Sequence, residues 1–388
     1  MKQIGILLTS PKEVGGIYQY SLSVIEALNL LYKKKKFKIR YYYSDKHWEK
    51  ELPKKADKVF IYKGIIKKII RKIIYSIIPK NLRYFFLQEF LHEEVKIINK
   101  SKCDLIIFPS QNITSYQINK KTISTIHDLM HIYESRFSEY TKEEIEQRDL
   151  HYQRICKFCD GILVDSLMGK EHVINSYKVK KDKLLTLPFI APSYLKKKNR
   201  INIFKKFNLK KKYLFYPAQF WEHKNHISLI KGFKEALANN KDISLVLCGA
   251  KKNYYQQVYN FVIQNHLEKK IFFLGRVSDD LMSSLYTSAV ATIYPSLCGP
   301  TNIPPLESVS LNIPLVCSNA YSMKKQMGNS AIYFNPNDYK NISKKINLIL
   351  NNKKLRKKLI SNGRKKIASY NIKHFSRLLE KYINNFLN

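Results

Sequence analysis

Short runs of apolar residues alternate along the chain with segments in which apolar residues recur at helical spacing. Each run is bounded by Gly, Pro or polar residues and predicts a buried strand. The strands expected in the first half are Ile4–Thr9, Lys38–Tyr43, Leu105–Pro109, Ile123–His127 and Gly161–Asp165. Those expected in the second half are Tyr213–Ala218, Ser244–Cys248, Ile271–Leu274, Val290–Tyr294, Leu315–Ser318 and Ala331–Phe334. Because the runs are apolar throughout and helices separate them, they indicate parallel sheets covered on both faces.

Helices are expected between these strands, where apolar residues fall on one side of a helix. They are Ser21–Tyr32, Lys142–Phe158, Ile227–Ala238, Tyr254–Asn265 and Leu281–Thr287. The alternation breaks at Pro188–Lys212, which contains the basic run Lys196–Lys198. We therefore predict two doubly wound α/β domains, residues 1–190 and 191–370. An amphipathic helix over residues 371–388 is expected to pack back on the first domain.

Charge is the most unusual feature of the composition. Lys and Arg number 69 and Asp and Glu 30 in 388 residues, so the formal net charge is +39. A surface this positive attracts anions such as nucleic acid, anionic lipid or a phosphorylated substrate. Only 11 of the cations are Arg, the residue that grips phosphate with a planar fork. Lys, Asn, Ile and Tyr are abundant together, which an AT-rich coding sequence also produces, so charge alone does not establish a polyanion site.

Cysteine spacing and hydropathy exclude several classes. Six Cys in so long a chain do not form a disulfide framework. Cys156 and Cys159 form one CxxC without a second ligand pair at zinc spacing, so we expect no metal and interpret both as small core residues. No apolar stretch reaches the roughly 18 residues of a membrane-spanning helix. The first apolar run is too short for a signal peptide, so we expect a cytoplasmic protein.

Two segments of the first half can bind a ligand where a strand ends. Gly15-Gly16 lies between a strand and a helix, where glycine lets backbone N–H groups approach an anion; a plain turn is the alternative. His127-Asp128 ends the strand Ile123–His127. The imidazole can donate to a sugar hydroxyl or carry a proton near neutral pH, and a histidine satisfied by a backbone carbonyl is the alternative.

A lysine-bearing turn follows the first strand of the second half. In Pro217–His226 the strand ends at Ala218, and Lys224 falls near the start of the next helix. A lysine there is a point charge for a diphosphate, and the helix dipole adds to it. The alternative reading is a turn in which Asn225 caps the helix.

A second turn of this kind, Pro295–Ser308, leads from a strand to Glu307 at an expected helix start. A carboxylate there can accept both hydroxyls of a ribose. The alternative is a glutamate that only favours the helix dipole. Backbone N–H groups of Thr301–Ile303 can hold phosphates as a concave nest.

The order of these four segments resembles that of the family 4 glycosyltransferases, which are retaining enzymes of the GT-B fold. Phe158–Ser166 and Phe272–Ser296 fit the same family, and the PPLES of Pro304–Ser308 is the most specific match. The resemblance covers nearly the whole chain. It implies an α/β protein of the GT-B fold, in which two Rossmann-like doubly wound domains face a central cleft.

The resemblance also assigns roles to residues. Gly15 and Gly16 are expected to face the diphosphate of a nucleotide-diphosphate sugar donor, and His127 the donor sugar near its reacting carbon. The donor-binding residues expected from it are Gly15, Gly16, Gln219, Lys224, Arg276, Gly299, Thr301, Asn302, Ile303 and Glu307, and the catalytic residues are His127, Lys224 and Glu307. Lys224 serves the diphosphate, Glu307 the ribose, and Arg276 borders the base.

Two positions depart from the family pattern. Gln219 stands where an Arg is usual, and Gly299 stands where the family has the first of two Glu separated by seven residues. These changes suggest an unusual donor or a sugar held by the backbone of Gly299–Ile303. They also leave open a loss of activity.

The implied reaction is sugar transfer with retained anomeric configuration, without a metal or other cofactor. Lys224 and helix termini would stabilise the leaving diphosphate. In similar enzymes the acceptor is often a lipid-linked glycan, here a polyprenyl-diphosphate oligosaccharide of bacterial surface polysaccharide synthesis. Isoleucine pairs alternate with cations in Lys63–Ile78, which is typical of a helix lying on anionic lipid. We therefore expect peripheral binding to the inner face of the plasma membrane, with an ordinary core-packed helix as the alternative.

Three other interpretations remain. A nucleic-acid-binding protein would rest on the net charge alone, because no known recognition motif accompanies it, and we expect no specific nucleic-acid partner. A non-catalytic glycosyltransferase-like subunit is suggested by Gln219 and Gly299. A GT-B phosphorylase, which resembles this family, is the weakest of the three, because such enzymes have a much longer chain and a pyridoxal lysine.

Overall fold

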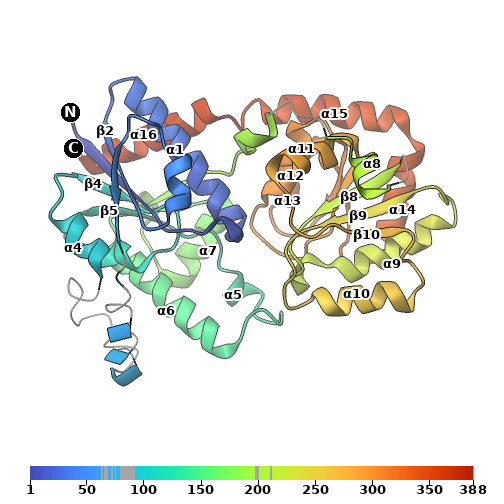
Figure 1. The fold of residues 1–388 in the computed structure, drawn as a ribbon, viewed down its shortest axis with the longest axis horizontal. Helices are drawn as coiled ribbons and strands as arrows, with labels where there is room; N and C mark the ends of the chain where they lie inside the picture. The colour runs from blue at the N-terminus through green and yellow to red at the C-terminus, as the bar shows by residue number, and fades with distance from the viewer. Residues whose placement is uncertain are drawn as a thin grey trace. The chain divides into compact units, whose positions relative to one another are not determined.

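The computed structural model describes residues 1–62, 64, 69–70, 73–74, 76–78, 92–196, 201–209 and 212–387. The chain forms two compact units, each of alternating strands and helices (Figure 1). The first unit comprises Met1–Leu129, Glu146–Pro188 and Ile372–Asn388. The second comprises Met130–Ile145 and Phe189–Asn371. The segment Met130–Ile145 therefore belongs to the second unit, although first-unit residues precede and follow it.

The first unit holds a parallel sheet of seven strands in the order β3-β2-β1-β4-β5-β6-β7. The strands are β1 Gln3–Leu8, β2 Lys38–Tyr43, β3 Asp57–Phe60, β4 Leu105–Ile107, β5 Lys121–Thr125, β6 Gly161–Val164 and β7 Leu184–Thr186. The five expected strands are confirmed. The two additional ones, β3 and β7, are the edges of the sheet; β3 begins with two charged residues, whereas β7 is mostly apolar.

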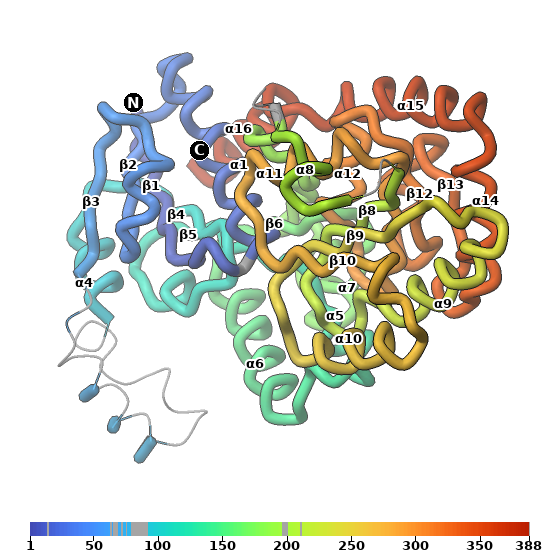
Figure 2. The backbone as a smooth tube through the Cα atoms, turned by 45° about the vertical axis from the view of Figure 1, so that its right-hand side comes forward, coloured from blue at the N-terminus to red at the C-terminus, as the bar shows by residue number. Residues whose placement is uncertain are grey.

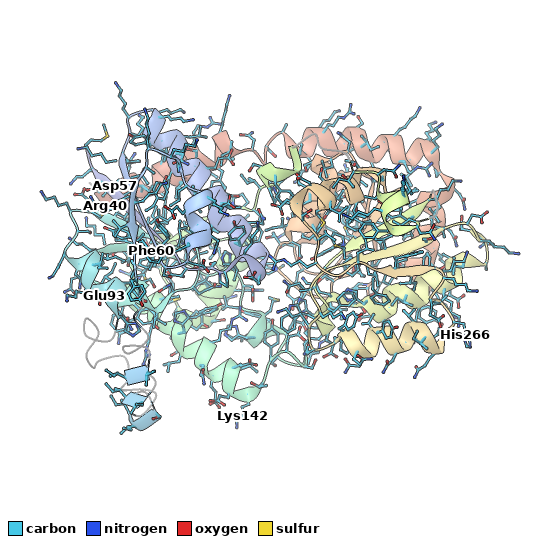
Figure 3. The ribbon with its side chains drawn as sticks, viewed as in Figure 1. Arg40, Asp57, Phe60, Glu93, Lys142 and His266 are labelled. Carbon is cyan, nitrogen blue, oxygen red and sulfur yellow. The ribbon has the colours of Figure 1, made fainter. Side chains whose placement is uncertain are left out.

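An ion pair joins the edge strand β3 to its neighbour β2. Arg40 on β2 and Asp57 on β3 lie side by side in Figure 3, with 2.7 Å between Nε and Oδ2. The cation and carboxylate pair in register, since Arg40 and Asp57 are cross-strand partners. The pair is partly exposed, so we assign it a contribution to strand register rather than a large stabilisation.

The helices of the first unit are α1 Gly16–Lys33, α4 Glu93–Asn99, α6 Lys142–Phe158, which begins in the second unit, α7 Leu167–Tyr177 and α16 Ile372–Leu387. Its 3₁₀ turns are η1 Lys12–Val14, η2 Lys46–Lys50, η3 Ile113–Tyr116 and η4 Lys181–Lys183. The C-terminal helix α16 lies along α1 (Figure 1). Ser376 donates to the Ala27 carbonyl at 3.1 Å, and Tyr382 accepts from the Ile162 N–H at 3.1 Å. The amphipathic stripe of this helix thus closes the core of the first unit.

The second unit holds a parallel sheet of six strands in the order β10-β9-β8-β11-β12-β13, whose winding can be followed in Figure 2. They are β8 Tyr213–Pro217, β9 Ser244–Cys248, β10 Ile271–Phe273, β11 Ala291–Tyr294, β12 Leu315–Ser318 and β13 Ala331–Phe334. All six expected strands are confirmed. They are the easiest to predict because nearly all their residues are buried.

The helices of the second unit are α5 Met130–Tyr133, α8 Ile203–Phe207, α9 His226–Leu237, α10 Tyr255–Gln264, α11 Asp279–Ser288, α12 Ile303–Ser310, α13 Met323–Met327, α14 Tyr339–Asn351 and α15 Lys353–Ile367. Its 3₁₀ turns are η5 Ser193–Lys196, η6 Glu222–Lys224 and η7 Gly328–Ser330. Helices α9 and α14 pack closely at Gly232, where a Cβ would lie 2.8 Å from the Tyr339 carbonyl oxygen. A larger residue would push these helices apart.

The cysteines are all buried and free, as expected. Burial raises the pKa of the Cys156 thiol to about 12, as suits an inert core residue. Among the residues that the structure describes, no group of His, Cys, Asp and Glu is arranged to hold a metal ion. Within the same residues, no helix is both long enough and apolar enough to span a bilayer.

Half of the residues of the predicted basic amphipathic helix Lys63–Ile78 lie outside the described residues. Ile69, Ile73 and Ile77 are described, and their side chains are exposed by 53%, 55% and 75%. They recur at a spacing of four, so on a helix they would share one side.

Candidate functional site

The second sheet defines a place for a ligand through its strand order. From the neighbours β8 and β11, the order runs outward in opposite directions, to β10 on one side and β13 on the other. Doubly wound sheets bind ligands beyond the carboxyl ends of the strands at such a position. Here β8 ends at Pro217 and β11 at Tyr294, and the loops that follow carry Lys224 and Gly299.

Several hydrogen bonds hold the turn that carries Lys224. The carbonyl of Lys224 accepts a 2.6 Å hydrogen bond from the Tyr216 hydroxyl. Asn225 has a positive φ of 59° and donates from Nδ2 to the carbonyls of Pro295 and Pro336, at 3.2 and 2.8 Å. Asn225 makes no side-chain cap to α9, so the capping alternative is wrong. Lys224 belongs to η6, before the helix starts at His226.

Lys224 contacts the buried Tyr294. Nζ of Lys224 donates to the Tyr294 hydroxyl at 3.3 Å, and its charge opposes the rise in the pKa of Tyr294 that burial causes. The charge of Glu307 adds a smaller effect on the pKa of Tyr294, in the opposite direction.

Glu307 is buried and holds two tyrosines. Its Oε1 accepts from Tyr194 at 3.0 Å, and its Oε2 accepts from Tyr286 at 2.6 Å. Burial raises the pKa of Glu307, and the two hydroxyl donors oppose that rise. Glu307 lies inside α12 rather than at its start, so the helix-dipole alternative is wrong. Pattern reading missed Tyr194 and Tyr286, because a tyrosine that binds a carboxylate looks in sequence like any core aromatic residue.

The backbone at Thr301–Ile303 is a poorer phosphate nest than predicted. The N–H of Asn302 donates to Gln326 Oε1 at 3.1 Å, while Gln326 Nε2 donates to the Asn302 carbonyl at 2.8 Å. Pro304 and Pro305, which follow, have no N–H to offer. The Asn302 side chain instead accepts from Tyr294 at 2.8 Å. Its predicted role is thus corrected from backbone donor to a support for Tyr294.

Gly299 has a backbone that few other residues adopt. Its φ is +113°, and a Cβ would lie 3.1 Å from Nδ2 of Asn302. A glutamate at this position would be strained.

The remaining predicted residues of the second unit lie at the same end of the sheet. Gln219 accepts from Trp221 Nε1 at 2.9 Å. Arg276 is exposed and follows Gly275, whose carbonyl accepts from the Gly249 N–H at 2.9 Å. Gly249 was not predicted, yet a Cβ there would lie 2.0 Å from the Ala218 carbonyl oxygen. Close packing of these loops thus requires a glycine after β9.

In the first unit, the glycines and His127 lie beyond the ends of the neighbouring strands β1, β4 and β5. Gly15 has a φ of +58° and precedes α1, which begins at Gly16. A glycine is therefore needed for the turn, and the plain-turn alternative and the phosphate-facing role both fit this conformation.

His127 lies just past β5, which ends at Thr125, rather than within the strand. Its Nε2 is 3.2 Å from the Pro109 carbonyl, and its ring meets Tyr20 edge to face at 5.0 Å. Burial lowers the pKa of His127 to about 4, so the ring is neutral at pH 7. The carbonyl contact matches the alternative stated for this residue, and it uses the single N–H of the neutral ring, so Nδ1 is left to accept a hydrogen bond from a sugar hydroxyl rather than to donate one.

Comparison with known proteins supports the family resemblance. The profile of the family described as "Glycosyl transferases group 1" matches residues 198–366. This part of the chain is therefore similar to the group 1 glycosyltransferases. This segment contains all of the predicted site residues of the second unit, among them Lys224, Gly299 and Glu307.

Two named relatives extend the match. The chain is 26% identical over 218 residues to O-antigen chain mannosyltransferase RfbU of Salmonella typhimurium, covering 56% of this chain and 57% of that protein. It is 23% identical over 229 residues to O-antigen chain mannosyltransferase B of Escherichia coli, covering 58% and 60%. The chain spans less than two thirds of the length of these relatives.

The fold is that of known glycosyltransferase structures. Anabaena Alr3699/HepE in complex with UDP and glucose superposes with a TM-score of 0.74 at 13% identity, covering 99% of this chain and 100% of that one. Together with the two parallel sheets, this shows a GT-B fold with two Rossmann-like units.

Proposed function

We propose that this chain transfers a sugar from a nucleotide-diphosphate donor to a glycan acceptor. The observation that carries the proposal is the placement of Lys224 after β8 and of the buried Glu307 after β11, at the position where the second sheet reverses its winding. A cation for a diphosphate and a buried carboxylate for a ribose are the two groups that a nucleotide-diphosphate site requires.

The donor is expected to bind with its diphosphate at Lys224 and its ribose at Glu307. Each carboxylate oxygen of Glu307 has two lone pairs, and the tyrosines use one of each, so acceptor capacity remains for two hydroxyls. His127, Gly15 and Gly16 would serve the sugar and diphosphate from the first unit.

The reaction we propose retains the anomeric configuration. The bond between the anomeric carbon and the diphosphate oxygen breaks as the acceptor hydroxyl attacks from the same face. The leaving diphosphate takes the acceptor proton, and Lys224 stabilises the charge that develops on it. The protein then needs no general base, and we propose that it needs no metal.

For the acceptor we propose a polyprenyl-diphosphate-linked glycan of bacterial surface polysaccharide. The relatives named O-antigen mannosyltransferases support this, and they make mannose the first donor sugar to test. A basic, isoleucine-rich surface at Lys63–Ile78 would hold the enzyme on the anionic inner leaflet where such an acceptor lies. Sedimentation with anionic liposomes at low salt tests this surface, and a chain that stays in the supernatant contradicts it.

The donor site is tested by a thermal-shift screen of GDP-, UDP- and dTDP-sugars, with GDP-mannose first. A donor at about 100 times its dissociation constant should add about 2.7 kcal/mol to the free energy of unfolding. Lys224→Met should reduce this gain to about 0.4–1.4 kcal/mol at the same donor concentration, because we expect its affinity to be about 10- to 100-fold lower. The proposal fails if none of these compounds shifts the wild-type chain.

A non-catalytic partner subunit is the second candidate, favoured by Gln219 and Gly299, the two positions that depart from the family pattern. Such a protein would show a thermal shift without turnover. Slow hydrolysis of the donor by the purified chain would exclude this alternative.

A further inference from the structure

The segment Met130–Ile145 contributes to the donor site although it follows His127 in the chain. It belongs to the second unit. Met130 and Phe137 pack with Cys298 in one apolar cluster, beside Leu297. The segment therefore lies against the loop that ends in Gly299.

Two consecutive residues of this segment bind two consecutive residues of the lysine turn. The N–H of Ser138 donates to Glu222 Oε2 at 2.8 Å. The carboxylate of Glu139 pairs through Oε1 with Nδ1 of His223. Lys224 comes next, so both contacts hold the residues that immediately precede the predicted diphosphate ligand.

His223 passes this restraint to the neighbouring loop. Its carbonyl accepts from the Leu297 N–H at 2.8 Å and from the Ser296 hydroxyl at 3.4 Å. The ring and the carbonyl of one residue thus join three parts of the chain: the segment with Glu139, the turn with Lys224, and the loop before Gly299.

The pair of Glu139 and His223 is mostly buried. The side chains of His223 and Glu139 are only 14% and 6% exposed. Burial raises the pKa of Glu139, but the hydrogen bond and charge of His223 outweigh burial and leave the pKa below its usual value. A buried carboxylate that stays ionised needs a cation at a fixed place. The contact with Glu139 therefore fixes the position of the His223 ring.

We propose that Glu139 is a positioning residue for donor binding, which acts through His223 on the turn that presents Lys224. This rests on the proposed role of Lys224 as a diphosphate ligand. A purely structural role is the alternative, in which Glu139 stabilises the fold and leaves the geometry of Lys224 unchanged.

The test is a double-mutant cycle on nucleotide affinity. Dissociation constants of GDP and UDP are measured by calorimetry for the wild-type chain, Glu139→Gln, Lys224→Met and the double variant. Glu139→Gln keeps the side-chain volume and removes the charge. We expect it to weaken binding about tenfold in the wild-type background and less than about twofold in the Lys224→Met background, because the two residues act in series.

Glu134→Gln is the matched control. Glu134 lies on the same segment and accepts a 2.6 Å hydrogen bond from Tyr321, not from the lysine turn. Glu134→Gln removes a carboxylate from the same segment without touching the lysine turn. We therefore expect nucleotide affinity to change less than about twofold.

The outcomes separate the proposals. Unchanged affinity in Glu139→Gln, or losses that multiply in the double variant, would overturn the positioning role. A wild-type chain that binds neither GDP nor UDP would overturn the proposed function and this inference together. Should Glu139→Gln fail to fold, His223→Gln removes the same pair from the other side and carries the same expectations.

Discussion

Tyr286 donates a 2.6 Å hydrogen bond to Oε2 of Glu307, and both residues are buried. Tyr194 supplies the corresponding bond to Oε1. The carboxylate is thus fixed in plane and rotation before any ligand arrives. A preorganised acceptor loses little freedom on binding, which favours affinity for a ribose over a flexible glutamate at the same place.

Tyr286→Phe should weaken the site and the fold together. The buried Glu307 loses a donor, which should lower the free energy of unfolding by about 1–3 kcal/mol. Nucleotide affinity should fall about tenfold, because the carboxylate is no longer held at one angle. Urea unfolding and calorimetric titration with the donor nucleotide measure the two effects.

Tyr213→Phe controls for the stability loss. The Tyr213 hydroxyl also donates inside the second unit, but to the Leu285 carbonyl rather than to Glu307. We expect a comparable loss of stability with unchanged affinity. If both variants bind nucleotide like the wild-type chain, Glu307 does not contact the ribose.

Lys224→Met should lower nucleotide affinity about 10- to 100-fold and leave stability nearly unchanged, since the side chain is only partly buried. The lost interaction is electrostatic, so the wild-type affinity should fall with added salt and that of the variant should depend on salt less steeply. Titrations at two salt concentrations measure this. Equal salt dependence in both proteins would place the diphosphate elsewhere.

The fold could be predicted from sequence where burial is complete. Strands such as Ser244–Cys248 are buried throughout, and their apolar runs were sufficient to locate them. The edge strand β3 was missed because it begins with the charged and partly exposed Asp57 and Lys58, whereas β7 is mostly apolar and was not recognised. The assignment of Met130–Ile145 to the second unit was also missed. Contacts such as that of Glu139 with His223 join residues far apart in sequence and leave no local pattern.

The site was predictable at the level of residues and less so at the level of roles. Lys224 and Glu307 were found because each follows a strand, and parallel strands bring such residues to one edge. Gln326, which occupies the Asn302 N–H, is far away in sequence and carries no local signal. Gly249 was missed because a glycine needed for close packing looks the same in sequence as one in an open loop.

His127 should make the fold sensitive to acid. Burial lowers its pKa from 6.5 to about 4. Between these values the unfolded chain binds the proton and the folded chain does not. The free energy of unfolding is therefore not reduced by His127 above about pH 6.5, and it falls as the pH drops from 6.5 to 4. The loss amounts to about 3 kcal/mol. Urea unfolding at several pH values measures it.

His127→Gln should flatten this pH dependence by about the same amount. His266→Asn is the control, because His266 is exposed and its positive φ of 53° suits asparagine. That variant should keep the wild-type slope between pH 4 and 6.5. An unchanged slope in His127→Gln would mean that the ring is protonated in the folded chain.

Gly299→Glu restores the residue that the resembled family carries, yet we expect it to damage the site. The φ of +113° is open to glycine and strained for other residues, and the new Cβ would lie 3.1 Å from Asn302. The substitution should lower the free energy of unfolding by about 1–3 kcal/mol. Displacing Asn302 would also disturb Tyr294 and hence the Lys224 contact, so donor affinity should fall.

Gly299→Ala separates the two causes. Because backbone strain needs only a Cβ, this variant should lose as much free energy of unfolding as the glutamate variant. If Gly299→Glu instead binds donor more tightly than the wild-type chain, the loop has the family's geometry and Gly299 marks a lost sugar contact.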